Sequence, residues 1–180
     1  MAAVMIKIET AAGAAKVARI LSALEPRTLL DLIGGRFLSY VDESFKTRGR
    51  GAWRPLSPLT LLLRKHGGDA PLQDSGAYKQ AFTPVKTDSQ TYVEVGSNRK
   101  TPSGLLLAEI HEHGTAPYTI TARNAKVLAA QGSNGWIFFG KQVNHPGVPA
   151  RPVLPTKAVA ERLIRETVDA VFARVERPGA

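Results

Sequence analysis

The stretch that most constrains the fold is HPGVPARPVLP, residues 145–155. Four of its eleven residues are proline, and each proline fixes φ, removes a backbone donor and pushes the preceding residue into extended geometry. The segment therefore cannot form a helix or a central strand, although it carries the apolar residues Val148, Val153 and Leu154. The sequence predicts a stiff connector that lies on a surface and delivers a final helix at a set angle.

The composition is that of a globular domain. The chain has 180 residues, of which 43% are hydrophobic and 22% are charged, enough to bury a core in a single domain over residues 1–180. The absence of cysteine excludes disulfides and thiolate catalysis. The N-terminus lacks the pattern of a signal peptide, and no stretch approaches the roughly 20 apolar residues that span a bilayer. We therefore expect no membrane contact and synthesis in a cytoplasm.

The basic charge is concentrated in one segment. The formal net charge is +9, which favours an anionic partner, either nucleic acid or an acidic protein surface. Residues 46–66 contain no acid and six basic residues: Lys46, Arg48, Arg50, Arg54, Arg64 and Lys65. All but Lys46 fall in a long irregular loop, residues 48–77, which we call the basic loop; loops of this length are usually functional or mobile. Two interpretations are open: a solvated loop, or a loop that faces an anion or a partner through Arg48, Arg50, Arg64 and Lys65.

Apolar spacing predicts the helices. One helix is expected from residue 12 to Pro26, and a second carries an apolar stripe from Leu29 to Phe45. Gly34-Gly35 inside the second helix predicts either a kink or a close crossing by another backbone. A third, C-terminal helix is expected after a cap at Thr156. A single turn of helix is expected within residues 58–65.

Alternation of apolar and polar residues predicts the strands. These are expected at residues 4–8, 77–85, 91–95, 118–122 and 125–130, with a hairpin at Asn134-Gly135 that leads into residues 136–139. Residues 105–111 form an apolar run that fits either a strand or a helix. The order predicts an α+β fold, with helices packed on one face of a mostly antiparallel sheet, long loops and a C-terminal helix.

Histidines offer candidate metal ligands. His111 and His113 would project from one face if they lie on a strand, and His145 would complete the three imidazoles of a catalytic zinc site. The spacing is wrong for a metalloprotease helix, which needs ligands four residues apart. We therefore expect no metal or other cofactor. His111 is interpreted as a polar residue that satisfies backbone groups near the Gly114 turn.

Asp74-Ser75 together with His111 is a weak sign of a hydrolase. No Gly-x-Ser-x-Gly elbow is present, and Asp-Ser-Gly is common in turns. Asp74 would then accept backbone hydrogen bonds as an Asx turn, and Gly76 would supply a positive φ. Trp53 is interpreted as an anchor that tethers the long loop. The sequence predicts a protein that is not an enzyme, with a small hydrolase as the least favoured hypothesis.

Four segments, taken in order, resemble the tailed-bacteriophage virion morphogenesis and tail-completion family. They are WRPLSPLT at residues 53–60, LQDSG at 72–76, AEIHEHG at 108–114 and PARPVL at 149–154. The resemblance extends from about residue 29 to about residue 171. Tyr78, Leu107 and Val153 depart from the residues that are usual in the family at those positions.

The resemblance implies a structural protein of the virion, at the phage neck or the head-proximal end of the tail, that acts in tail completion and head–tail joining. It implies a homo-oligomer, a hexameric ring, in contact with adjacent neck, connector and tail-tube proteins and non-specifically with packaged DNA. Such a protein is made in the bacterial host cytoplasm. Its structural or interface residues would be Trp53, Arg54, Asp74, Gly76, His111, Gly114 and Arg151. The alternative is a basic DNA-binding or capsid-associated accessory protein without a ring.

Two of these expectations concern arginines. The rigid backbone around Arg151 holds its guanidinium at low entropic cost for a carboxylate or backbone carbonyls, either within the subunit or across the ring. In a ring, the basic loops would converge and multiply the local potential. Trp53 and the Pro55–Pro58 pair make that loop stiff and amphipathic, which favours docking on protein over contact with DNA.

Overall fold

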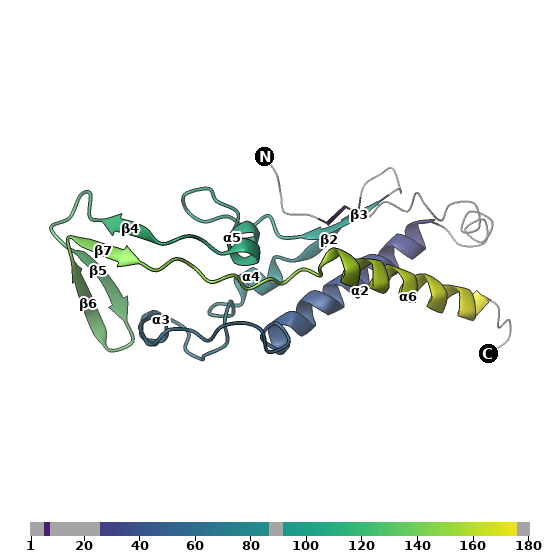
Figure 1. The fold of residues 1–180 in the computed structure, drawn as a ribbon, viewed down its shortest axis with the longest axis horizontal. Helices are drawn as coiled ribbons and strands as arrows, with labels where there is room; N and C mark the ends of the chain where they lie inside the picture. The colour runs from purple at the N-terminus through teal and green to yellow at the C-terminus, as the bar shows by residue number, and fades with distance from the viewer. Residues whose placement is uncertain (1–5, 8–25, 87–91, 176–180) are drawn as a thin grey trace. The chain divides into compact units, whose positions relative to one another are not determined.

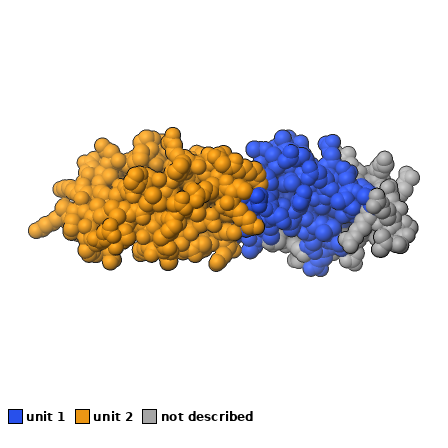
Figure 2. Space-filling view, turned by 90° about the horizontal axis from the view of Figure 1, so that it is seen from below, with its two compact units in different colours: residues 1–43, 82–97, 154–180 blue, residues 44–81, 98–153 orange. Residues whose placement is uncertain are grey.

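The structure is a computed structural model that describes residues 6–7, 26–86 and 92–175 (Figure 1). The contacts divide the chain into two compact units, where the sequence predicted one domain (Figure 2). Unit 1 comprises residues 1–43, 82–97 and 154–180, and unit 2 comprises residues 44–81 and 98–153. Each unit has buried hydrophobic residues of its own.

The described chain contains both helices and short strands, and it ends in a long helix (Figure 1). The described helices are α2 (Pro26–Lys46), α3 (Pro58–Leu63), α4 (Ala77–Gln80), α5 (Leu107–His113) and α6 (Lys157–Val175). The described strands are β1 (Ile6–Lys7), β2 (Thr83–Lys86), β3 (Val93–Gly96), β4 (Tyr118–Thr121), β5 (Leu128–Gly132), β6 (Gly135–Gly140) and β7 (Gln142–His145). The predicted α+β class with a C-terminal helix is confirmed. The strands form three small antiparallel sheets instead of one: β1-β3-β2, β4-β7 and β5-β6.

Unit 1 places two helices on one face of the sheet β1-β3-β2. Val93 and Val95 alternate with Glu94 along β3, so both valines point to the same face, where they are buried. They share a core with an apolar stripe of α2 and with α6: Leu29, Leu30, Ile33, Phe37, Ala160 and Leu163. An exposed ion pair between Arg36 and Glu166, 3.5 Å apart, links the two helices at the surface.

The helix boundaries follow from local chemistry. Pro26 begins α2, as its fixed φ allows at a first helical position, and the predicted helix before it lies outside the described residues. The Thr156 carbonyl accepts from the Ala160 N–H at 2.8 Å, so α6 starts directly after Thr156 as predicted. A close backbone crossing at Gly35 is not found, because a Cβ built there meets no atom within 4 Å.

One strand prediction needs correction, and one open assignment is decided. Residues 77–85 do not form one strand, because Gly76 takes a left-handed φ of 72° and starts the single-turn helix α4 before β2 begins at Thr83. Residues 105–111, which fitted either class, contain the start of helix α5. The predicted turn between β2 and β3 lies mostly outside the described residues.

Unit 2 contains two antiparallel strand pairs, the β5–β6 hairpin and the pair β4–β7. The predicted hairpin at Asn134-Gly135 is confirmed, because Gly132 pairs with Gly135 and the two residues between them form the turn. The Ser133 N–H donates to the Leu62 carbonyl at 2.9 Å, which joins this turn to α3. In the other pair, Tyr118 lies opposite His145, and their rings stack with centroids 4.7 Å apart.

Candidate functional site

Residues 145–153 of the proline-rich segment belong to unit 2. After β7 it contains no helix or strand, as predicted, and we call residues 147–153 the strap. The strap runs along the C-terminal end of α5: the Thr115 N–H donates to the Val148 carbonyl at 2.9 Å, and the Arg151 N–H donates to the His111 carbonyl at 2.6 Å. The strap belongs to no helix or sheet, so its backbone groups bond instead to α5, to the residues after α5 and to side chains.

Arg151 connects the strap to the basic loop. Its side chain is buried, and its Nε and Nη2 donate to the Arg54 carbonyl at 3.2 and 3.0 Å, with a longer contact of 3.5 Å from Nη2 to the Pro55 carbonyl. Burial, and then the nearby charge of Arg54, lower the pKa of Arg151. The guanidinium therefore binds backbone carbonyls within the subunit, one of the two arrangements that the sequence predicted.

Trp53 also ties the basic loop to the strap. The indole is 5% exposed, and its Nε1 donates to the Pro152 carbonyl at 3.0 Å. Phe45 meets Trp53 edge-on with ring centroids 5.8 Å apart and meets Tyr78 at 6.0 Å. These three aromatic side chains form a small buried core of unit 2. Trp53 is thus an anchor for the loop, as the sequence interpretation expected.

Helix α5 contributes its last turn to the same site. The Glu112 carboxylate accepts from the Val153 N–H at 2.6 Å, a contact that sequence reasoning missed because it assigned no partner to Glu112. Gly114 ends the helix with a φ of 72°, and a Cβ placed on it would lie 2.6 Å from the Val148 carbonyl oxygen. The close approach of the strap therefore requires glycine at this position.

The prediction that the His111 side chain satisfies backbone groups was wrong. The backbone carbonyl of His111, not its ring, makes the hydrogen bond to the strap. The ring lies against Tyr78 with centroids 5.0 Å apart, and its buried Nδ1 has no hydrogen-bond partner among the described residues. Burial and then the charge of Arg151 lower the pKa of His111 to about 4. Desolvation and then Glu112 raise the pKa of the Tyr78 hydroxyl, so both rings are uncharged at neutral pH.

The turn at residues 72–76 joins this site through Gln73, whose Nε2 donates to the Phe45 carbonyl at 2.9 Å. Gly76 has the predicted positive φ. Asp74 does not form the predicted Asx turn: its carboxylate accepts from the His66 N–H at 3.1 Å and from Arg64 Nε at 3.3 Å. Desolvation opposes ionisation of Asp74, but these two hydrogen bonds outweigh it and lower the pKa of its carboxyl.

The basic loop is less open to a partner than its sequence indicates. The Arg64 side chain is 6% exposed and donates inward, to Asp74 and to the carbonyls of Gly68 and Ala70, so its prediction as an anion-facing residue was wrong. Arg48 pairs with Asp69 at 2.8 Å. Arg50 donates to Ser44 Oγ at 2.8 Å. The two acids that pair with these arginines, Asp69 and Asp74, follow the acid-free segment of residues 46–66 in the sequence.

A left-handed turn follows α2 and was not predicted. Arg48, Gly49, Arg50 and Gly51 have φ values of 52°, 66°, 57° and 80°. The Gly51 N–H donates to the Thr47 carbonyl at 2.9 Å and closes the turn. A non-glycine residue in this conformation costs about 1 to 2 kcal/mol, so the side-chain contacts of the two arginines offset a strain that glycine would avoid. The alternating Arg-Gly-Arg-Gly sequence was the available signal.

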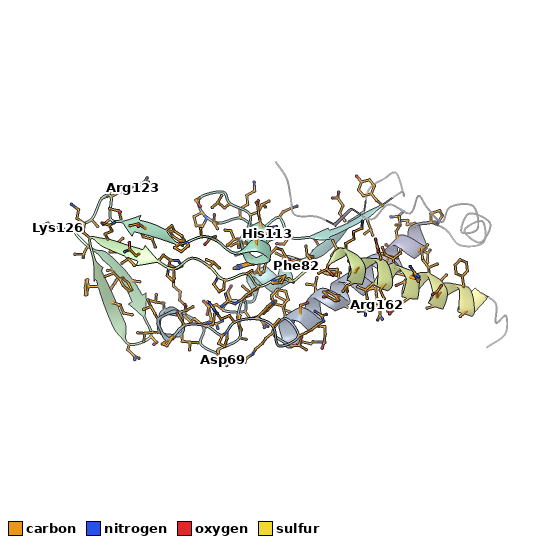
Figure 3. All side chains as sticks on the ribbon, in the orientation of Figure 1. Asp69, Phe82, His113, Arg123, Lys126 and Arg162 are labelled. Carbon is orange, nitrogen blue, oxygen red and sulfur yellow. The ribbon has the colours of Figure 1, made fainter. Side chains whose placement is uncertain are left out.

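The described residues do not bring together the histidines of the metal hypothesis or the Asp74 and His111 of the hydrolase hypothesis. Because α5 is a helix, His111 and His113, two residues apart, point to different sides of it. His113 is exposed (Figure 3). His145 Nδ1 accepts from the Gly147 N–H at 3.1 Å. No group of three or more metal-ligating side chains occurs among the described residues. Asp74 is engaged by Arg64 and His66 rather than by His111.

The buried imidazole makes stability depend on pH. The unfolded chain binds a proton at His111 below about pH 6.5, whereas the folded chain binds it only below about 4. The free energy of unfolding should therefore fall as the pH drops from 6.5 to 4. The loss should be about 2 kcal/mol at most, because the imidazole is partly exposed and solvent screens its charge. Urea unfolding of His111→Gln should show less of this loss than the parent protein. His113→Gln is the matched control and should retain it; equal pH profiles for the two variants would contradict the assignment.

Comparison of this chain with protein families, with curated proteins and with solved structures found no match. In the described part of the chain, no helix combines the length and apolar character that crossing a membrane requires.

Proposed function

We propose that this protein is a structural, non-enzymatic subunit of a tailed-phage particle that forms a ring at the neck or the head-proximal end of the tail. One observation carries the proposal. Of the four segments that resemble the tail-completion family, three meet in unit 2 through direct hydrogen bonds: residues 53–60, 108–114 and 149–154. The fourth, residues 72–76, is joined to them through Phe45, whose carbonyl accepts from Gln73 and whose ring packs on Trp53. Independent chance matches have no reason to meet in one site.

The chemistry of this site supports a structural role over a catalytic one. Its polar groups are bound to one another: Arg151 to the Arg54 carbonyl, Glu112 to the Val153 N–H, and Trp53 to the Pro152 carbonyl. His111 has a pKa of about 4, far below the neutral range in which a general base works best. The site therefore fixes the geometry of two loops and a strap, which is what a subunit with rigid side surfaces requires.

The excess positive charge lies in unit 2, which favours an anionic neighbour for that unit. Unit 2 contains 13 of the 24 lysines and arginines and 4 of the 15 acidic residues, a balance of +9. Unit 1 contains 11 of each and is neutral. This asymmetry also suits the alternative function, a DNA-binding accessory protein without a ring, whose affinity for duplex DNA would fall steeply with salt.

The test is electron microscopy of tails assembled from the same gene cluster, with and without this protein. We expect a ring of six-fold symmetry at the head-proximal end that disappears when the protein is left out. A single asymmetric copy, or no density, at that end would overturn the ring. Normal tails that join heads without this protein would overturn the role in joining.

A further inference from the structure

The β5–β6 hairpin has a covered face and an open aromatic face. Alternation along β6 places Ile137 and Phe139 on the covered face and Trp136 and Phe138 on the other. Trp136 and Phe138 are 64% and 68% exposed, the largest exposed fractions among the large hydrophobic side chains that the structure describes. The residues opposite them on β5 are Gln131 and Ala129, which leave the two rings uncovered.

This aromatic face is costly to leave in water. A two-stranded sheet is marginally stable by itself, and it normally packs one of its faces against other parts of the protein. Here the covered face already fulfils that role, because Leu128, Ala130, Ile137 and Phe139 are partly buried. The two exposed rings therefore add nothing to the core of the hairpin. Large aromatic side chains clustered on a rigid element are the usual anchors of protein interfaces.

The charges around the hairpin specify the partner. Residues 114–150 contain Arg123, Lys126 and Lys141 and no acidic residue. Arg123 and Lys126 lie at the turn between β4 and β5, beside the hairpin (Figure 3). Two copies of this face in contact would oppose these like charges, which disfavours self-association through it. The four residues of the aromatic face itself carry no charge, which suits a protein surface better than a phosphate backbone.

We infer that the aromatic face (Ala129, Gln131, Trp136 and Phe138) is a docking surface for a different protein, one that presents apolar side chains ringed by acidic residues. The inference deepens the proposed function and rests on it for the setting, a neighbouring ring of the particle. Trp136 and Phe138 enter the apolar centre of the partner, and Arg123, Lys126 and Lys141 meet its acidic rim. The basic loop, whose arginines are partly held by internal contacts, is secondary to this surface.

The two tryptophans allow a direct test in solution. Trp53 is buried and Trp136 is exposed, so acrylamide quenching reports mainly on Trp136. The full-length protein is titrated with four defined probes: an amphipathic peptide with leucine on one face and glutamate on the other, the same peptide with lysine for glutamate, a 20-base-pair duplex and a 20-nucleotide single strand. We expect protection of Trp136 by the acidic peptide alone.

Variants tie the binding to the face. With a labelled acidic peptide, F138S and the double variant K126E and K141E should each weaken binding about tenfold or more. L105S removes another exposed apolar side chain outside the hairpin, and K157E reverses an exposed charge outside both the hairpin and the basic loop, so both should leave binding unchanged. Unchanged circular dichroism shows that the variants fold.

Each other outcome overturns the inference. Protection by DNA assigns the face to nucleic acid, equal protection by the basic peptide removes the charge argument, and protection that rises with protein concentration alone assigns it to a second copy. No protection by the acidic peptide rejects the docking surface. The test needs no particle, so acidic-peptide binding without a ring on tails would overturn only the proposed function, and the reverse result only this inference.

Discussion

Replacing Gly147 with alanine is expected to lower the free energy of unfolding of unit 2 by about 3 to 5 kcal/mol. Gly147 has a φ of 88°, and a Cβ at this position would overlap the carbonyl oxygen of Thr115 and approach the carbonyl carbon of Ala116 at 3.0 Å. Both obstacles are backbone atoms, which cannot move aside as a flexible side chain can. The strap would have to leave α5, with the loss of its hydrogen bonds.

The chain offers a matched control for this variant. Gly104 has the same φ of 88°, but a Cβ there meets nothing within 4 Å, so Gly104→Ala should cost only about 1 kcal/mol. Denaturant unfolding of both variants, in a Trp136→Phe background, is followed by the fluorescence of Trp53, which reports on the strap through its bond to Pro152. Equal losses for the two variants would show that backbone conformation, and not the close approach of the strap, limits stability.

The second large effect is expected at Arg151. Arg151→Ala removes the hydrogen bonds from the buried guanidinium to the Arg54 and Pro55 carbonyls and should destabilise unit 2 by about 2 to 3 kcal/mol. Arg151→Lys keeps the charge but lacks the planar fork, so it should recover less than half of this loss. Under the proposed function, particle assembly should decrease in the same order, because the basic loop and the strap would no longer be joined.

Arg123→Ala is the control for Arg151. Arg123 is exposed and carries the same charge in the same unit, and its replacement should change the free energy of unfolding by less than about 0.5 kcal/mol. The measurement is the same Trp53-monitored unfolding. Full stability of Arg151→Ala would mean that the Trp53 and Glu112 contacts suffice to hold the strap and that the guanidinium is dispensable.

Patterns within a few residues predicted much of the local structure. The apolar stripe of α2, the start of α6 after Thr156 and the hairpin at Asn134-Gly135 each depend on neighbours in sequence, and all were predicted correctly. The strand predicted at residues 77–85 failed because its alternation came from a single helical turn, in which Tyr78 is buried against Phe45. Short segments whose burial is set by distant residues do not carry a reliable period.

The candidate site was predictable in its residues and not in its contacts. Trp53, Gly114 and Arg151 stood out because tryptophan, a helix-ending glycine and an arginine between prolines are restricted by their own chemistry. Glu112 and Gly147 did not stand out, because nothing in their neighbourhood shows that a carboxylate will accept from the Val153 N–H or that two backbones will touch. The inward orientation of Arg64 was equally hidden, since its partner Asp74 follows the basic segment.

The sequence by itself determined the α+β fold class, the prolines and glycines that interrupt helices and strands, and the excess of positive charge. These depend on composition and on local backbone chemistry. Only the tertiary structure decided where the charge remains exposed and which aromatic rings face water. It buried Trp53 against the strap and left Trp136 exposed on β6, although both tryptophans follow a short glycine-containing segment. The difference is physical: burial depends on which distant segment folds over a side chain, and a sequence pattern of a few residues contains no information about that segment.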